Sequence, residues 1–286
     1  MKPDPPRLPP AVVTTLPGRG EAFARVLDGP AGALPVLLLH GWMATADVNW
    51  FALFPALDGR HPVVAPDLRG HGRGPMTPFS IEDCADDAAA LVRSLGHDRV
   101  VVVGYSMGGA VAQSLADRHP DLVAGTVLAA TALHWRGPLR RFLLWRSGWD
   151  GVSQRSTEGR WFAHRLIDRA ARRSPEVEAI RGWAVAEIER GHPGALRRAG
   201  RALNRFDGRP MAARASKPEV VVVTTQDTLV RPSRQRDLAA RRGAEIVELA
   251  ANHDAPARET AAFAGALVAA ISRVAARATA VAVDAA

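Results

Sequence analysis

The sequence predicts an α/β fold in which helices cover both faces of a mostly parallel central sheet. Short runs of β-branched and other apolar residues recur along the chain, and helical patterns separate most of them. Strands that are buried on both faces are continuously apolar, which is typical of parallel sheets. In such a fold we expect a ligand to bind at the carboxyl ends of the strands.

The strand-like runs are short and evenly spread, and they lie at 22–27, 36–39, 63–65, 100–103, 125–129, 220–224 and 246–249. Helices are expected over 83–95 and 110–119, which are followed by Gly96 and Pro120, two residue types that end helices. The stretch 260–272 is expected to be a terminal helix that packs on the sheet. It is the longest apolar stretch, and it falls short of the ~20 residues that span a bilayer.

The chain is expected to be one α/β core with an inserted helical cap. Residues 1–17 are interpreted as a proline-rich arm, 18–135 and 214–286 as the two parts of the core, and 136–213 as the cap. No strand-like run interrupts the cap. Between Arg136 and Pro210 there are 17 arginines and 8 acidic residues, a balance of +9 in a chain whose net charge is +8, and four of the seven tryptophans.

Composition excludes several function classes. The single cysteine, Cys84, cannot form an internal disulfide. No cysteine and histidine spacing suits a metal, and no glycine pattern suits a nucleotide, so neither a metal nor a cofactor is expected. The arginines are dispersed among carboxylates and tryptophans, which argues against nucleic-acid binding. Prolines and charges stand at the N-terminus where a signal peptide needs an apolar core, so a cytoplasmic location is expected.

A nucleophile elbow is predicted at Ser106. A β-branched run, 100–103, stops at Gly104, and a helix-compatible run starts at Gly109. Serine on such a tight strand-to-helix turn has a strained backbone, and the turn closes only where its neighbours lack side chains, a condition that Gly104 and Gly108 meet. The hydroxyl then lies at the N-terminus of a helix, whose partial positive charge stabilises developing negative charge.

Partners for Ser106 follow later in the chain, first an aspartate and then a histidine. Asp227 comes at the end of one strand-like run, and His253 comes shortly after another. This order predicts a triad in which His253 takes the proton of Ser106, while buried Asp227 orients the imidazole and stabilises the imidazolium. Asp254 is the alternative acid, but it directly follows the histidine and is poorly placed to orient that ring.

An oxyanion hole is predicted where the run 36–39 leads into His40-Gly41-Trp42. The backbone N–H of Trp42 and that of Met107, directly after the nucleophile, are the expected donors. Gly41 allows the close backbone approach. His40 is expected to be structural and to hydrogen-bond the loop.

These features resemble the α/β-hydrolase family, in particular its single-chain, cap-bearing members with a serine nucleophile. The resemblance covers roughly residues 20–275 and rests on His40-Gly41, the glycine-rich turn 67–74, the Ser106 elbow, Asp227 and His253. It implies a cap that roofs the pocket and selects the substrate. Relatives that open epoxides or displace halide carry aspartate at the elbow, so Ser106 argues against both chemistries. Asn252 stands where relatives commonly carry glycine, and asparagine tolerates the left-handed conformation better than most residues.

The expected function is hydrolysis of a carboxylic ester through an acyl-enzyme, with a small-molecule ester as the binding partner. The same triad would also serve a thioesterase, a lactonase or a C–C bond hydrolase. A hydrolase fold retained as a non-enzymatic ligand receptor is a further alternative, which the intact triad disfavours. The basic, tryptophan-rich cap is compatible with a lipid-like or anionic substrate and with peripheral membrane contact. The sequence leaves the oligomeric state open.

Overall fold

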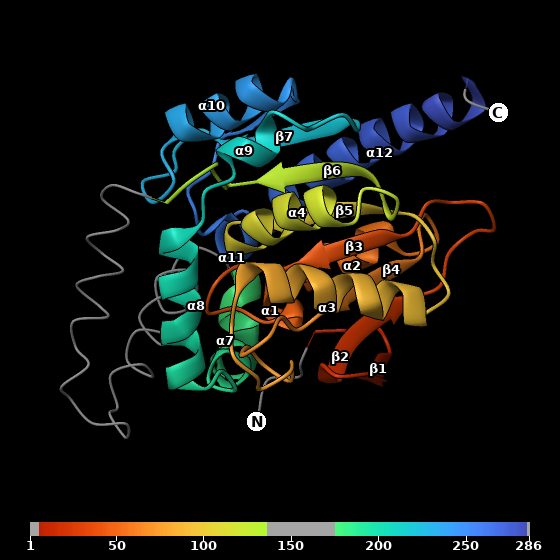
Figure 1. Cartoon of the computed structure of the whole chain (residues 1–286). Helices are drawn as coiled ribbons and strands as arrows, with labels where there is room; N and C mark the ends of the chain where they lie inside the picture. Colours follow the sequence, from red (N-terminus) through yellow and green to blue (C-terminus); the bar gives the residue numbers. More distant parts are fainter. Residues whose placement is uncertain (1–5, 136–174, 285–286) are drawn as a thin grey trace.

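A computed structural model describes residues 6–135 and 175–284. Its centre is an 8-stranded sheet with the order β1-β2-β4-β3-β5-β6-β7-β8 (Figure 1). The strands are β1 (Ala11–Leu16), β2 (Gly20–Leu27), β3 (Val36–Leu39), β4 (Val63–Pro66), β5 (Val100–Tyr105), β6 (Val123–Ala129), β7 (Glu219–Thr224) and β8 (Glu245–Leu249). β2 pairs antiparallel with β1 and β4, and all other pairs are parallel. The predicted α/β class and mostly parallel sheet are confirmed.

Helices cover both faces of this sheet. They are α1 (Ala46–Trp50), α2 (Phe54–Leu57), α3 (Ile81–Ser94), α4 (Met107–Arg118), α7 (Pro175–Ile188), α8 (Pro193–Arg205), α9 (Arg209–Ala212), α10 (Pro232–Arg242), α11 (Ala255–Arg258) and α12 (Thr260–Asp284). One face carries α3, α4 and α10, and the other carries α1, α2, α11 and α12. The two predicted core helices are present as α3 and α4.

The central strand β5 shows why its sequence is continuously apolar. Val100 and Val102 pack into the core cluster on the α3 and α4 face, whereas Val101 and Val103 pack into the cluster beneath α12. Because successive strand residues point to opposite faces, both sets must be apolar. The strand is therefore packed on both faces up to its carboxyl end, where Ser106 follows.

The sheet begins earlier than the sequence analysis expects. Ala11–Leu16, inside the stretch expected to be a proline-rich arm, form the edge strand β1. Alternation explains the strand, because Val12, Thr14 and Leu16 turn inward while their neighbours are exposed. An edge strand tolerates nearby prolines, since one side needs no hydrogen bonds.

The terminal helix α12 is longer than the expected stretch 260–272. Its window Thr260–Val281, 22 residues with a mean hydropathy of 1.4, is long and apolar enough to cross a membrane, which corrects the expectation that no stretch approaches that length. This is weak evidence for a span, because a core helix passes the same test. Phe263, Leu267 and Ile271 are buried against the sheet, as a core helix requires.

The described part of the expected cap is helical. Between Pro175 and Ala213 it consists of α7, α8 and α9, with one isolated β-bridge between His134 and Asp207. Figure 1 shows α7 and α8 on the side of the molecule toward which the arrowheads of β3 and β6 point. Residues 136–174, which hold three of the four cap tryptophans, lie outside the described residues.

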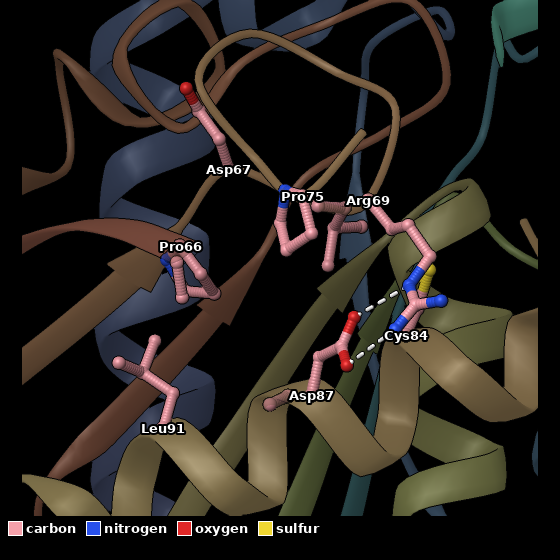
Figure 2. Close-up of a pocket in the computed structure, with 10 residues that line it drawn as sticks. Pro66, Asp67, Arg69, Pro75, Cys84, Asp87 and Leu91 are labelled. Atoms are coloured by element: carbon pink, nitrogen blue, oxygen red, sulfur yellow. Dashed lines mark hydrogen bonds and ion pairs between the residues drawn. The ribbon is translucent and has the colours of Figure 1, made fainter. Parts of the chain in front are cut away.

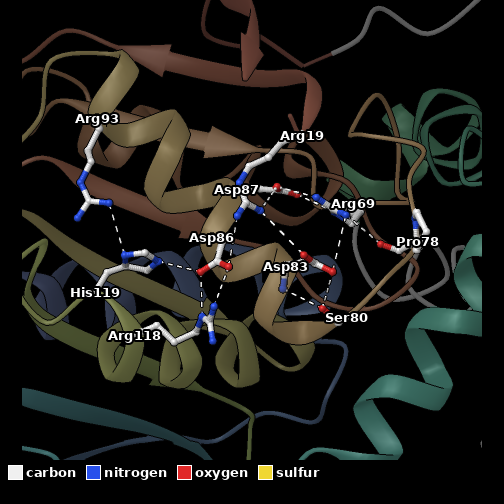
Figure 3. Close-up of polar contacts among 10 residues, drawn as sticks. All are labelled: Arg19, Arg69, Pro78, Ser80, Asp83, Asp86, Asp87, Arg93, Arg118 and His119. Carbon is white, nitrogen blue, oxygen red and sulfur yellow. Dashed lines mark hydrogen bonds and ion pairs between the residues drawn. The ribbon is translucent and has the colours of Figure 1, made fainter. Parts of the chain in front are cut away.

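Arginines of the core pair with neighbouring carboxylates. Figure 3 shows the acidic side of α3 surrounded by basic groups. Asp86 accepts bonds from Arg118 at 2.8 Å and from His119 at 2.9 Å, and Arg118 holds the pKa of the Asp86 carboxyl far below its usual range. Asp87 accepts a bidentate pair from Arg69, with both distances 2.7 Å. Arg69 and Arg118 therefore pair with carboxylates of α3 and help to hold the fold together.

Candidate active site

Ser106 sits on a strained turn between β5 and α4. Its backbone has φ 54° and ψ −116°, a combination outside the left-handed helical region that residues with a Cβ rarely adopt. The flanking glycines are required by space, because a methyl group at Gly104 would lie 2.4 Å from the Gly108 carbonyl oxygen. A methyl at Gly108 would lie 2.0 Å from the carbonyl oxygen of Leu39, at the end of β3. The tight turn thus depends on both glycines.

Three segments bring Ser106, His253 and Asp227 together. The Oγ of Ser106 lies 3.0 Å from Nε2 of His253, and Nδ1 of the same ring lies 2.8 Å from Oδ2 of Asp227. A carboxylate can only accept, so Nδ1 carries the proton and Nε2 is free to accept from the hydroxyl. The structure does not bring Asp254 to the histidine, since its carboxylate pairs with Arg258 at 3.3 Å.

The carboxylate of Asp227 is completely buried and held from several sides. Besides the imidazole, it accepts bonds from Thr224 Oγ1 at 2.9 Å, Gln235 Nε2 at 3.3 Å, and the N–H groups of Leu229 and Val230 at 2.8 and 2.7 Å. Bonds to an ionised acceptor are the stronger kind, so they fix the charge in place. Thr224 and Gln235 were not singled out from the sequence, where only the position of Thr224 three residues before the acid was a signal.

Asn252 ties the loop of Asp227 to the loop of His253. Its Oδ1 accepts from the N–H of His253 at 2.7 Å and from the N–H and hydroxyl of Thr228 at 3.1 and 3.3 Å. Asn252 does not use the left-handed conformation that asparagine tolerates, because the described non-glycine residues with positive φ are Met43, Ser106 and Ala130. The amide oxygen, rather than the backbone conformation, distinguishes this asparagine from a glycine.

Tyr105, directly before Ser106, supports the loop that carries His253. Its hydroxyl donates to the backbone carbonyl oxygen of His253, and the two rings lie 5.5 Å apart between centroids. Burial raises the pKa of the Tyr105 hydroxyl well above its usual value, so it remains a donor. No local sequence pattern points to Tyr105, because its contact joins residues far apart in the chain.

The turn after β3 lies against the elbow. A methyl group at Gly41 would be 3.1 Å from Cδ1 of Tyr105 and 3.4 Å from Cβ of Ser106, so only glycine lets the turn approach this closely without displacing a neighbour. Within residues 6–135 and 175–284, the N–H groups of Trp42 and Met107 find no hydrogen-bond acceptor. Two unpaired donors beside a nucleophile are what an oxyanion hole requires.

His40 fastens the same turn from below. Its Nδ1 donates to the Gly41 carbonyl oxygen at 2.8 Å, and its Nε2 accepts from the N–H of Leu68 at 2.8 Å. Burial lowers the pKa of His40 to about 3, so the ring stays neutral and can perform both roles. Its contacts are structural, as expected from the sequence.

The described part of the chain contains no group of three or more His, Cys, Asp or Glu residues that could hold a metal ion. Figure 2 shows a small cavity beside β4 that Cys84 lines together with the Arg69 and Asp87 pair. Burial raises the pKa of the Cys84 thiol far above its usual range, so a thiolate nucleophile is disfavoured there.

Comparisons with known proteins identify the family of this chain. A family model described as the alpha/beta hydrolase fold matches residues 35–257. Lipase LipV of Mycobacterium tuberculosis is 43% identical over 37% of this chain and 40% of its own length. A pimeloyl-[acyl-carrier protein] methyl ester esterase of Neisseria meningitidis is 30% identical over 71% of this chain and 65% of its own length. The chain therefore matches less than two thirds of either relative. A solved thermophilic esterase of Thermogutta terrifontis superposes with a TM-score of 0.74 at 26% identity, covering 93% and 99% of the two chains.

Proposed function

Because the chain belongs to the α/β-hydrolase fold family, we propose that it is a serine hydrolase that cleaves carboxylic esters through Ser106, His253 and Asp227. The observation that carries this proposal is the unbroken hydrogen-bond chain from the Ser106 hydroxyl through the imidazole to a buried carboxylate, with distances of 3.0 and 2.8 Å. Nucleophile, base and orienting acid are each within hydrogen-bond reach of the next.

In the first half of the reaction, His253 Nε2 accepts the proton of Ser106 as Oγ attacks the ester carbonyl carbon. The carbonyl oxygen becomes an oxyanion, which the N–H groups of Trp42 and Met107 stabilise. The tetrahedral intermediate then collapses, and the imidazolium returns its proton to the leaving alkoxide. An acyl group remains on Oγ, and the alcohol departs.

In the second half, water attacks the acyl carbon while His253 again acts as the base. Collapse of this intermediate releases the carboxylic acid and restores the Ser106 hydroxyl. Asp227 keeps its charge throughout and stabilises the imidazolium in both halves. Because the triad supplies the nucleophile and the backbone supplies the electrophilic stabilisation, no cofactor is proposed.

Carboxylic esters are favoured over thioesters, lactones and C–C bonds because two of the similar proteins are named as a lipase and as a methyl ester esterase. The basic segment from Arg136 to Pro210 further favours an anionic or lipid-like ester, since its balance is +9. Salt tests this preference: kcat/KM for an anionic ester should fall as ionic strength rises, because screening shortens to about 8 Å at 0.15 M. A neutral ester of equal size is the control, and equal responses would contradict the preference.

A panel of nitrophenyl esters of graded chain length, run beside acyl-CoA thioesters, tests the function. We expect turnover of esters by the wild-type chain and its loss in Ser106→Ala. Ser114→Ala is the matched control, because Ser114 is a buried serine on α4, the helix that begins directly after Ser106. Faster turnover of the thioesters would favour the thioesterase alternative. Binding of esters without any turnover would favour a receptor.

A further inference from the structure

The indole ring of Trp42 lies directly on the cap helix α8. Its Nε1 donates a hydrogen bond to the Leu196 carbonyl oxygen at 2.8 Å. One turn later, Gly200 leaves room for the ring, because a methyl group there would lie 3.0 Å from Cζ2 of Trp42. Residues four apart share one face of a helix, so both contacts hold the ring against the same side of α8.

Small residues let α8 approach the core this closely. Ala195 and Ala199 are buried on the inner face of the helix together with Gly200. A second close contact lies at Gly70, in the turn after β4, where a methyl group would come within 2.8 Å of Cβ of Ala195. The neighbouring helix α7 is fastened to the same turn by the ion pair of Arg73 and Glu187 at 2.9 Å. The position of α8 is thus defined relative to the catalytic edge of the sheet.

Hydrogen bonds anchor the backbone on both sides of Trp42. Before it, the N–H of Gly41 donates to Asn49 Oδ1 at 2.9 Å, and His40 holds the Gly41 carbonyl. After it, the N–H of Ala44 donates to the Gly41 carbonyl oxygen at 3.3 Å. Between these anchors Met43 has φ 63°, a left-handed conformation that is strained for a residue with a Cβ. A strained turn keeps its geometry only when its surroundings hold it, and the indole of Trp42 provides such a contact.

We propose that the Trp42 side chain is a positioning residue that couples the cap helix α8 to the oxyanion turn. The inference rests on the proposed function, because it concerns the direction of the Trp42 N–H. When Leu196 and Gly200 hold the indole, the N–H faces the oxyanion, and when α8 is displaced, it turns away. The interaction is made to the transition state, so its loss lowers kcat and leaves KM nearly unchanged.

Two variants test the coupling from its two sides. Trp42→Phe removes the indole N–H but keeps an aromatic ring, and Gly200→Ala adds a methyl against that ring. Trp183→Phe, on α7, and Gly265→Ala, on α12 where a methyl meets nothing within 4 Å, are the matched controls. The measurements are kcat and KM for a nitrophenyl ester, the rate at which a nitrophenyl phosphonate modifies Ser106, and the melting temperature.

We expect Trp42→Phe and Gly200→Ala each to lower kcat and the phosphonylation rate about tenfold, since complete loss of one oxyanion donor costs about 10²–10³. KM should stay within about twofold, and the controls should match the wild type. The double variant should be no slower than the slower single variant, because both break one linkage. A purely structural role would lower the melting temperature and leave kcat of the folded chain intact.

The outcomes separate the coupling from the function beneath it. If the wild-type chain reacts with the phosphonate and both variants react at its rate, the coupling is wrong and the function stands. A rise in KM with unchanged kcat would also overturn the coupling, since the ring would then only contact the substrate. If Ser106 of the wild-type chain is not phosphonylated, the proposed function fails and the coupling fails with it.

Discussion

Two buried aspartates stand at the same edge of the sheet, and the proposed function gives them different roles. Asp67 follows β4 and accepts from the N–H groups of Ala46 at 2.7 Å and Arg73 at 2.9 Å. Asp227 follows β7 and holds the imidazole of His253. Both carboxylates are fully buried, so burial and position at the carboxyl end of a strand do not distinguish a catalytic acid from a structural one.

The partners of the two aspartates account for the difference. From Asp67 the contacts lead through Arg73 to Glu187 and Asp47, and so return into the fold. From Asp227 they lead to His253, whose side chain is 18% exposed, and then to the Ser106 hydroxyl. A chain of polar contacts that ends at an accessible nucleophile can do chemistry, whereas a closed network fixes a turn.

The largest expected effect is on the Asp227 side, at the base. His253→Ala should lower kcat by about 10⁴ or more, because it removes the base whose Nε2 lies 3.0 Å from the Ser106 hydroxyl. Activity of the wild-type chain should also fall as pH drops, since a protonated imidazole cannot act as the base. Ester kinetics from pH 5 to 8 measure both effects. His97→Ala is the control, and a comparable loss of kcat in that variant would contradict the assignment of His253 as the base.

Asp227→Asn should be the next most damaging change. Its amide cannot hold Nδ1–H in the productive tautomer, so we expect kcat to fall by about 10³–10⁴ while the chain stays folded. Asp254→Asn is the matched control, because Asp254 contacts Arg258 instead of the histidine. Circular dichroism would establish folding beside the ester assay. A larger loss in Asp254→Asn would exchange the roles of the two acids.

Asn252→Gly tests the Asp227 side of the comparison, because it removes the link between the loops of Asp227 and His253 and leaves the three triad residues in place. It removes the oxygen that joins the two loops, and we expect kcat to fall about tenfold because small misplacements of catalytic groups are costly. Asn252→Asp keeps the acceptor and should retain most of kcat. Its added negative charge favours the nearby imidazolium, so the acid limb of the pH–rate profile should move to higher pH. Identical profiles for Asn252→Asp and the wild type would contradict a position beside His253.

Asp67→Asn should have the smallest effect on catalysis and act on stability instead. Burial raises the pKa of Asp67 from 3.8 to about 6, so the folded chain binds more protons than the unfolded chain between these values. Stability therefore falls as pH rises through this window, by at most about 3 kcal/mol. Asp67→Asn should lack this pH dependence of the free energy of unfolding. Urea unfolding of the wild type and the variant at pH 4 and 7 measures it. The same pH dependence in both proteins, or a kcat of the variant reduced more than about threefold, would contradict the structural role.

Local sequence predicted much of the fold, because burial on both faces forces continuous apolar strands. The elbow was predictable for the same kind of reason, since Gly104 and Gly108 are dictated by backbone contacts within a few residues. The strand β1 was not predicted, because the prolines beside it favoured an extended arm. The contacts of Tyr105 with the histidine loop and of Trp42 with Leu196 join segments far apart in the chain, so no local pattern signals them.

The central claim is that Ser106 carries the acyl group, and a trapped intermediate tests it most directly. The chain is mixed with excess nitrophenyl ester, quenched in acid and digested with trypsin, which releases residues 100–118 as one peptide containing both Ser106 and Ser114. We expect a burst of about one nitrophenolate per chain and an acyl adduct that fragmentation assigns to Ser106. An adduct on Ser114 or on another peptide, or a chain that turns over the ester with Ser106 replaced by alanine, would contradict the account.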